Sequence, residues 1–151
     1  MKFQIEKPVF LKALQRVQGI VEKRNTMPIL ANILIKTRDG KIEIMATDLD
    51  VSIKDLCDAV VKKEGSATIN ARKLFEIIKE APDDKIDITD EDSGKITIKS
   101  GKAEFSIVGL PVGEFPSFPV YDEGGLFRAA PETLKEMIEK TVFASSTDET
   151  R

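Results

Sequence analysis

A helical pattern between Asn70 and Pro82 is the clearest feature of the chain. Apolar residues recur there at the i, i+3, i+4, i+7 spacing of one helix face; they are Leu74, Ile77, Ile78 and Ala81. Asn70 is a favourable N-cap and Pro82 cannot continue a helix, so both ends are marked. A β-type run at residues 66–69 precedes the helix. The pattern therefore predicts a strand, a tight corner and an amphipathic helix.

The same unit opens the chain. Residues 2–6 alternate between apolar and polar side chains as a half-buried strand does, and Pro8 suits the first turn of a helix. Apolar residues then recur with helical spacing at Phe10, Leu14, Val17 and Val21. We predict a second amphipathic helix here, with Lys12 and Arg16 on its polar face.

Each predicted helix is followed by segments typical of strands. In the first block these are residues 29–35, 41–45 and 51–56. Asp39 and Gly40, between the first two, are a strong hairpin signal. In the second block they are residues 85–89, 95–98 and 103–108. Each block thus reads as a strand, a helix and three strands.

The two blocks align as an internal repeat. Their apolar positions coincide in the pairs Ile5 with Ile69, Phe10 with Leu74, and Leu14 with Ile78. We therefore predict an α+β fold of paired strand–helix–three-strand repeats with pseudo-twofold symmetry, its helices on one face of antiparallel sheets. Residues 1–119 form one domain on this interpretation, with repeats at about 1–64 and 65–119.

A third copy of the unit begins near the end of the sequence. Residues 110–119 are rich in proline, and residues 120–125 end in Glu-Gly-Gly, which is typical of a linker. Within residues 126–151, Pro131 marks a helix start, and the apolar stripe that follows is Leu134, Met137 and Ile138. Because no strands follow to cover this helix, we expect the chain to be an N-terminal fragment of a longer repeat protein.

Composition argues against most catalytic classes. The chain has no His, the usual general base at neutral pH and the commonest metal ligand. Its single cysteine, Cys57, is expected to be a small buried hydrophobe. Residues 89–100 lack the end ligands of a calcium loop, and Asp48 and Asp50 fit turn chemistry better than paired-carboxylate catalysis. We expect no catalytic site, metal or cofactor.

The sequence also carries no membrane signal. No apolar run approaches the roughly 20 residues that span a bilayer, and the N-terminal residues lack the apolar stretch of a signal peptide. We therefore expect a cytoplasmic protein without membrane contact.

Charge is unevenly distributed, although the formal net charge is only −3. Residues 7–24 carry five basic side chains against one acidic one, whereas residues 83–92 carry six acidic side chains against one basic one. Lys12, Arg16 and Arg72 fall on the polar faces of the two predicted helices. Positive charge on symmetry-related helices can follow a phosphate backbone without reading sequence; an ordinary solvated helix face is the alternative.

Several segments together resemble one known family in their order and spacing. Besides the opening Met-Lys-Phe they are RNTMPILANIL at 24–34, TDLD at 47–50, ARKLF at 71–75, LPVGEFP at 110–116 and DETR at 148–151. They look like the bacterial sliding clamp, the beta subunit of DNA polymerase III. The resemblance implies a non-catalytic homodimer ring with three such domains per subunit. It implies as partners duplex DNA, bound without sequence preference, the replicative DNA polymerase and the clamp loader.

The resemblance also implies roles for individual residues. Those matching positions at or near the DNA path are Arg24, Arg72 and Arg151, which Lys12 and Arg16 join from the basic helix face. Those matching the first domain's share of the head-to-tail subunit contact are Lys73, Ile77, Phe105 and Ile107. Ala81 stands where the family usually has Leu, which implies an altered interface at that position.

The shortness of the chain sets further expectations. Because the partner surface of the family lies on a third domain, we expect this piece to be monomeric and to bind duplex DNA weakly, with strong salt dependence. Two other functions remain as alternatives at this point. One is a protein-interaction scaffold that binds no nucleic acid, and the other is an acid-dependent hydrolase using Asp48 and Asp50.

Overall fold

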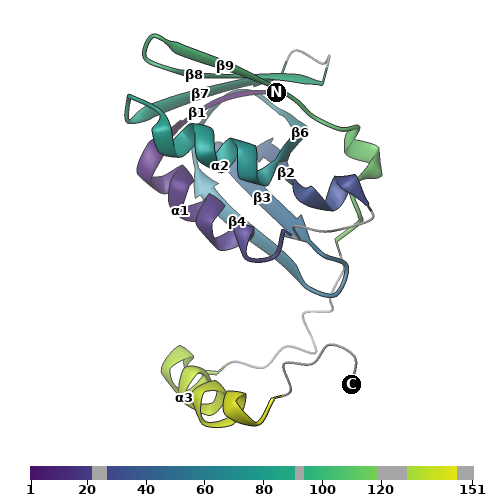
Figure 1. The fold of residues 1–151 in the computed structure, drawn as a ribbon. Helices are drawn as coiled ribbons and strands as arrows, with labels where there is room; N and C mark the ends of the chain where they lie inside the picture. Colours follow the sequence, from purple (N-terminus) through teal and green to yellow (C-terminus); the bar gives the residue numbers. More distant parts are fainter. Residues whose placement is uncertain (22–26, 91–93, 119–128, 146–151) are drawn as a thin grey trace. The chain divides into compact units, whose positions relative to one another are not determined.

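The computed structural model describes residues 1–21, 27–90, 94–118 and 129–145 (Figure 1). The chain divides into two compact units, Met1–Phe118 and Pro119–Arg151, and each is treated separately below.

The first unit contains two helices and the strands that surround them. The helices are α1 (Lys7–Gln18) and α2 (Ala71–Glu80). The strands are β1 (Lys2–Glu6), β2 (Asn32–Arg38), β3 (Lys41–Thr47), β4 (Ser52–Asp58), β5 (Val60–Lys63), β6 (Gly65–Asn70), β7 (Lys85–Asp90), β8 (Lys95–Ser100) and β9 (Ala103–Val108). Two short 3-10 helices, η1 (Pro28–Ala31) and η2 (Val112–Glu114), complete the unit.

The strands form two antiparallel sheets, ordered β5-β1-β7-β8-β9 and β4-β3-β2-β6. The first strand of each repeat lies in the sheet of the other repeat, because β1 pairs with β7 and β6 pairs with β2. Figure 1 shows α1 and α2 side by side, and the two helices are in contact. This reciprocal exchange of strands agrees with the predicted pseudo-twofold, and the predicted α+β class is confirmed.

The core lies between the helices and the sheets. Phe10 and Leu14 of α1 are fully buried, as are their counterparts Leu74 and Ile78 of α2. Phe10 meets Phe3 of β1 edge to face, with ring centroids 6.3 Å apart. Such a pair contributes about 0.5–1.5 kcal/mol beyond the area it buries. The apolar stripes read from the sequence are therefore core-facing, as predicted.

The predicted cap of α2 is confirmed. Asn70 Oδ1 accepts a hydrogen bond of 3.0 Å from the backbone N–H of Lys73, one of the donors left unpaired at a helix start. At the other end the helix stops at Glu80, ahead of Pro82. The corner between β6 and α2 is therefore fixed by local chemistry.

Two predicted turns are also confirmed. Asp39 and Gly40 both have positive φ, 49° and 73°, which is the backbone of a type I′ hairpin between β2 and β3. In the turn after β3, Asp48 Oδ1 accepts from the N–H groups of Asp50 and Val51 at 3.0 and 2.6 Å. The Asp48 carboxylate thus stabilises the turn.

One strand boundary and one helix boundary differ clearly from the prediction. The strand expected at residues 29–35 is wrong over its first part: η1 occupies Pro28–Ala31 and β2 begins at Asn32. Ile29 and Leu30 bury instead in a second apolar cluster that includes Phe115, far along the chain. Helix α1 ends at Gln18, so Val21 lies beyond it.

Strand β5 was not predicted at all. It pairs with β1, placing Val61 opposite Phe3. Its four residues are mostly exposed. A strand that buries so little shows neither the alternation of apolar and polar residues nor the apolar run by which a strand is predicted. The first repeat consequently has one more strand than the second.

The second unit contains α3 (Pro131–Thr141), followed by the short 3-10 helix η4 (Val142–Ala144). The helix predicted to start at Pro131 is confirmed. Leu134, Met137 and Ile138 are 48%, 60% and 53% exposed. The residues that precede this helix in the third copy of the unit lie almost wholly outside the described residues.

Candidate functional site

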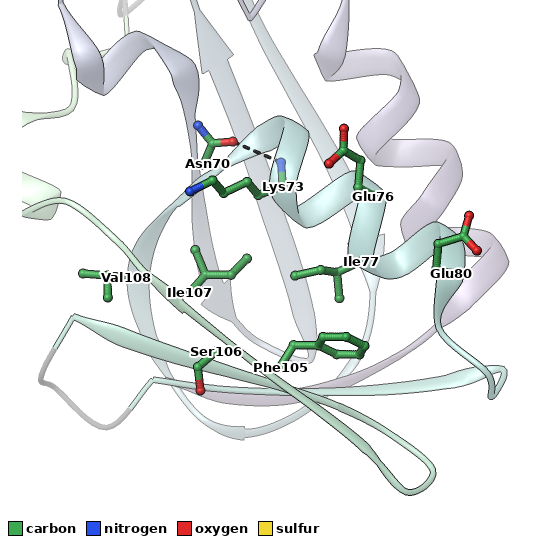
Figure 2. Close-up of a pocket in the computed structure, with 9 residues that line it drawn as sticks. All are labelled: Asn70, Lys73, Glu76, Ile77, Glu80, Phe105, Ser106, Ile107 and Val108. Atoms are coloured by element: carbon green, nitrogen blue, oxygen red, sulfur yellow. Dashed lines mark hydrogen bonds between the residues drawn. The ribbon is translucent and has the colours of Figure 1, made fainter.

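A hollow of about 560 Å³ lies between α2 and β9 (Figure 2). It is lined by Asn70, Lys73, Glu76, Ile77, Glu80, Phe105, Ser106, Ile107 and Val108. Four of the five residues expected at a subunit contact are among them: Lys73, Ile77, Phe105 and Ile107. The structure therefore brings together residues that lie about thirty positions apart in the sequence.

The side chains that line this hollow suit contact with another protein. Figure 2 shows Ile77, Phe105 and Ile107 facing the space between α2 and β9. Ile107 is 7% exposed and forms an apolar floor, whereas Glu76 and Glu80 supply charge at the rim. An apolar centre with a polar rim is the usual anatomy of a protein–protein contact.

The adjoining strand edge adds a second feature. Among the described strands, β9 is the last of its sheet, so its outer edge carries no neighbouring strand. Val108, at its end, is 79% exposed. An unpaired edge presents backbone N–H and C=O groups that another strand can bind. Because Val108 also lines the hollow, the hollow and this edge adjoin one another.

Ala81 does not belong to that surface. Its residue exposure is 3% and its side chain packs in the core. Its carbonyl, just past the end of α2, accepts a 2.7 Å hydrogen bond from Lys7 Nζ. A cation at a helix C-terminus satisfies a carbonyl that the helix leaves unpaired. The structure thus gives Ala81 the core position that periodicity indicates and supports no direct place in the interface.

Three of the five residues expected to contact DNA lie within the described residues, and all three are exposed on the helices. Lys12 and Arg16 are exposed on α1, and Arg72 is exposed on α2. Arg72 also borders a second hollow, of about 710 Å³, between α2 and the C-terminal end of α1. The remaining two residues, Arg24 and Arg151, lie outside the described residues. The two helices thus carry their cations on adjacent exposed surfaces.

Each of the two helix arginines meets a carboxylate. Arg16 Nη1 lies 2.6 Å from Asp55 Oδ2 on β4. Arg72 Nε lies 3.1 Å from Glu76 Oε1, four residues further along the same helix. The second pair has a recognisable i, i+4 spacing. The Arg16–Asp55 pair could not be predicted from the sequence, because no sequence pattern links two positions that lie 39 residues apart.

Cys57 is a core residue, as expected. It is 7% exposed, and its thiol pKa is raised from the ordinary value of 9.0. The chief cause is burial, to which the charge of Asp55 adds, while Arg16 acts in the opposite direction. The thiol therefore stays protonated at neutral pH and is a poor nucleophile.

Within the described ranges, no group of three or more His, Cys, Asp or Glu side chains is placed to hold a metal ion. In the same ranges, no helix combines the length and the apolar character needed to cross a bilayer.

The fold and the surface together define a class of protein. It is a domain of two repeats that exchange their first strands, with basic residues on its helices and an unpaired outer strand, β9. Residues 1–119 match the family described as DNA polymerase III beta subunit, N-terminal domain. The chain belongs to this family.

Relatives and solved structures agree with that assignment. The beta sliding clamp of Caulobacter vibrioides is 41% identical over 157 residues, and that of Halalkalibacterium halodurans is 36% identical over 159 residues. Both alignments cover the whole of this chain. The crystal structure of the sliding clamp from Bacillus subtilis matches all of it with 34% identity and a TM-score of 0.95, covering 42% of that chain.

The chain spans 41% to 42% of the length of the curated relatives named above.

Proposed function

We propose that this chain supplies the first domain of a DNA sliding clamp. In that assembly a closed homodimer ring encircles duplex DNA and tethers the replicative DNA polymerase, without catalysing a reaction itself. The observation that carries the proposal is the family match over residues 1–119, on a unit whose exposed contact surface lies at one sheet edge. Residues 120–125 are the linker, and residues 126–151 begin the second clamp domain.

DNA contact is assigned to the basic residues of the helix surface. They are Lys12, Arg16 and Arg72, together with Arg24 and Arg151. Lys and Arg side chains on helices reach phosphates and carry no base information by themselves, so binding is independent of sequence and weakens with salt. This matches a protein that must move along the duplex after it has been placed there.

Subunit contact is assigned to the hollow between α2 and β9. Ile77, Phe105 and Ile107 provide its apolar floor, and Lys73 contributes a cation at the rim. A head-to-tail contact uses a different surface on the partner, and repetition of such contacts closes a ring when the rotation permits. By itself, residues 1–151 would carry only one of the two surfaces and remain monomeric.

The remaining partners are those of DNA replication. We assign the replicative polymerase and the clamp loader to the longer protein, acting in the cytoplasm, with no cofactor.

The test uses the longer protein and a nicked circular plasmid. Once loaded, the clamp should co-elute with the circle through gel filtration in salt that removes simple electrostatic binding. Cutting the plasmid at one site should then release it. Equal retention on circular and linear DNA would contradict a ring, and no retention on either would favour a scaffold that binds no nucleic acid.

A further inference from the structure

The two helix arginines differ in how firmly their carboxylates hold them. The Arg16–Asp55 pair is short, at 2.6 Å; the Arg16 side chain is 50% exposed, but the Asp55 side chain is only 16% exposed. The Arg72–Glu76 pair is longer, at 3.1 Å, and its two side chains are 75% and 60% exposed. A short charge-assisted hydrogen bond to a largely shielded carboxylate is held more firmly than a longer pair in which both side chains are mostly exposed.

Asp55 is also anchored more firmly than Glu76. Its Oδ1 accepts from the N–H of Leu56 at 3.1 Å, and its backbone lies in β4, where it pairs with Ile44 of β3. Helix α1 packs directly on β4. Glu76 instead lies on the same helix as Arg72, on a flexible exposed side chain. Asp55 therefore presents a fixed carboxylate to Arg16.

We propose that Asp55 is a positioning residue that holds Arg16 away from phosphate, so that Arg72 is the stronger DNA contact of the two helices. The inference rests on the proposed function of this face. A cation that stays paired with a carboxylate adds little net charge and releases few counterions from DNA. An arginine with a loosely held partner can exchange that carboxylate for a phosphate. Asp55 thus lowers the affinity of the helix face for the duplex.

The experiment is an NMR titration of the isotopically labelled 151-residue chain with a short duplex of mixed sequence, at two salt concentrations. Asp55→Asn removes the charge and retains an oxygen that can accept from Leu56. Asp58→Asn is the matched control, because Asp58 also lies on β4 but meets Lys41 at 3.9 Å and is 93% exposed. The two variants have the same net charge.

Asp55→Asn should bind the duplex more tightly than wild type and than Asp58→Asn. One additional phosphate contact should increase its advantage over wild type by about 3.5-fold for each fourfold reduction in salt. Arg16→Gln in the Asp55→Asn background should remove that advantage. In the wild-type background, Arg72→Gln should weaken binding more than Arg16→Gln does.

Two results would overturn the inference: Asp55→Asn binding no more tightly than Asp58→Asn, or Arg16→Gln costing as much affinity as Arg72→Gln. The second comparison decides the matter even if Asp55→Asn proves unfolded by its amide spectrum. Failure of the proposed DNA face is distinguishable, because then wild type itself would show no duplex-dependent shifts along α1 and α2. That result would overturn both proposals.

Discussion

Glycine positions on this chain range from tightly enclosed to open. A Cβ built on Gly109 would overlap the backbone oxygen of Thr68 and lie 2.9 Å from Ile96 Cδ1. Thr68 in turn binds both the N–H and the C=O of Leu110 through its hydroxyl. The segment after β9 is therefore fastened to β6 at a point where only glycine fits.

Gly109→Ala should accordingly destabilise the first unit by about 1–3 kcal/mol, the usual cost of overpacking. Gly113→Ala is the matched control, because nothing lies within 4 Å of its added Cβ. Gly113 lies in the 3-10 helix η2, and its replacement should be neutral or slightly stabilising. Urea denaturation of both variants measures their free energies of unfolding. Equal values would show that the backbone around Gly109 can shift to accept a Cβ without cost.

Cys57 gives the fold a predictable response to alkaline pH. Because burial raises the pKa of its thiol above 9.0, the folded state retains a proton that the unfolded state loses first. The contribution of the Cys57 thiol to the free energy of unfolding is complete below pH 9.0. As the pH rises further, this contribution falls by at most about 1.4 kcal/mol per pH unit. The stability advantage of wild type over Cys57→Ala should therefore narrow above pH 9.0. A constant gap across that range would contradict the buried-thiol account.

At the scale of elements, the contact surface between α2 and β9 is the feature with the clearest consequence. Ile77 faces the hollow without being fully buried and also packs against the edge of the core, so its replacement removes apolar area chiefly from the hollow. The minority of interface residues that cost more than about 1 kcal/mol when truncated cluster near the centre of the interface.

In the longer protein, Ile77→Ala should therefore raise the dissociation constant of the ring roughly tenfold, which corresponds to about 1.4 kcal/mol. Val9→Ala is the control, since Val9 is 44% exposed on α1 and does not line the hollow. Sedimentation velocity over a dilution series measures both. Identical dissociation by the two variants would place the subunit contact elsewhere.

The elements also show what local sequence can predict. Helix α2 was predictable, because its cap, apolar period and terminating proline all lie within a dozen residues. The segment at Pro28–Ala31 was not, although it has the aliphatic content of a strand. Its conformation follows Pro28 and the burial of Ile29 and Leu30 beside Phe115, a contact made only in the folded chain.

The candidate site divides in the same way. Helical periodicity places Lys12, Arg16 and Arg72 on exposed faces, and the structure agrees. The hollow, in contrast, forms only when β9 packs beside α2, and its residues were identified through a family resemblance. The Arg16–Asp55 pair had no local signal of any kind, since strand pairing and helix packing create it.

At the scale of the whole molecule, the exchange of β1 and β6 between sheets makes the two repeats one folding unit. β1 pairs with β7 of the second repeat as well as with β5 of its own, and β6 pairs with β2 of the first repeat, so neither repeat is complete alone. The unit consequently presents its helices and its β9 edge in a fixed relation.

If the longer protein holds DNA by enclosing it, the lifetime of the complex on linear DNA should depend on whether the two ends are blocked by bound proteins. In salt that abolishes ordinary phosphate binding, the complex on end-blocked DNA should be long-lived and should be lost as soon as one end is unblocked. A lifetime that does not depend on the ends would contradict enclosure.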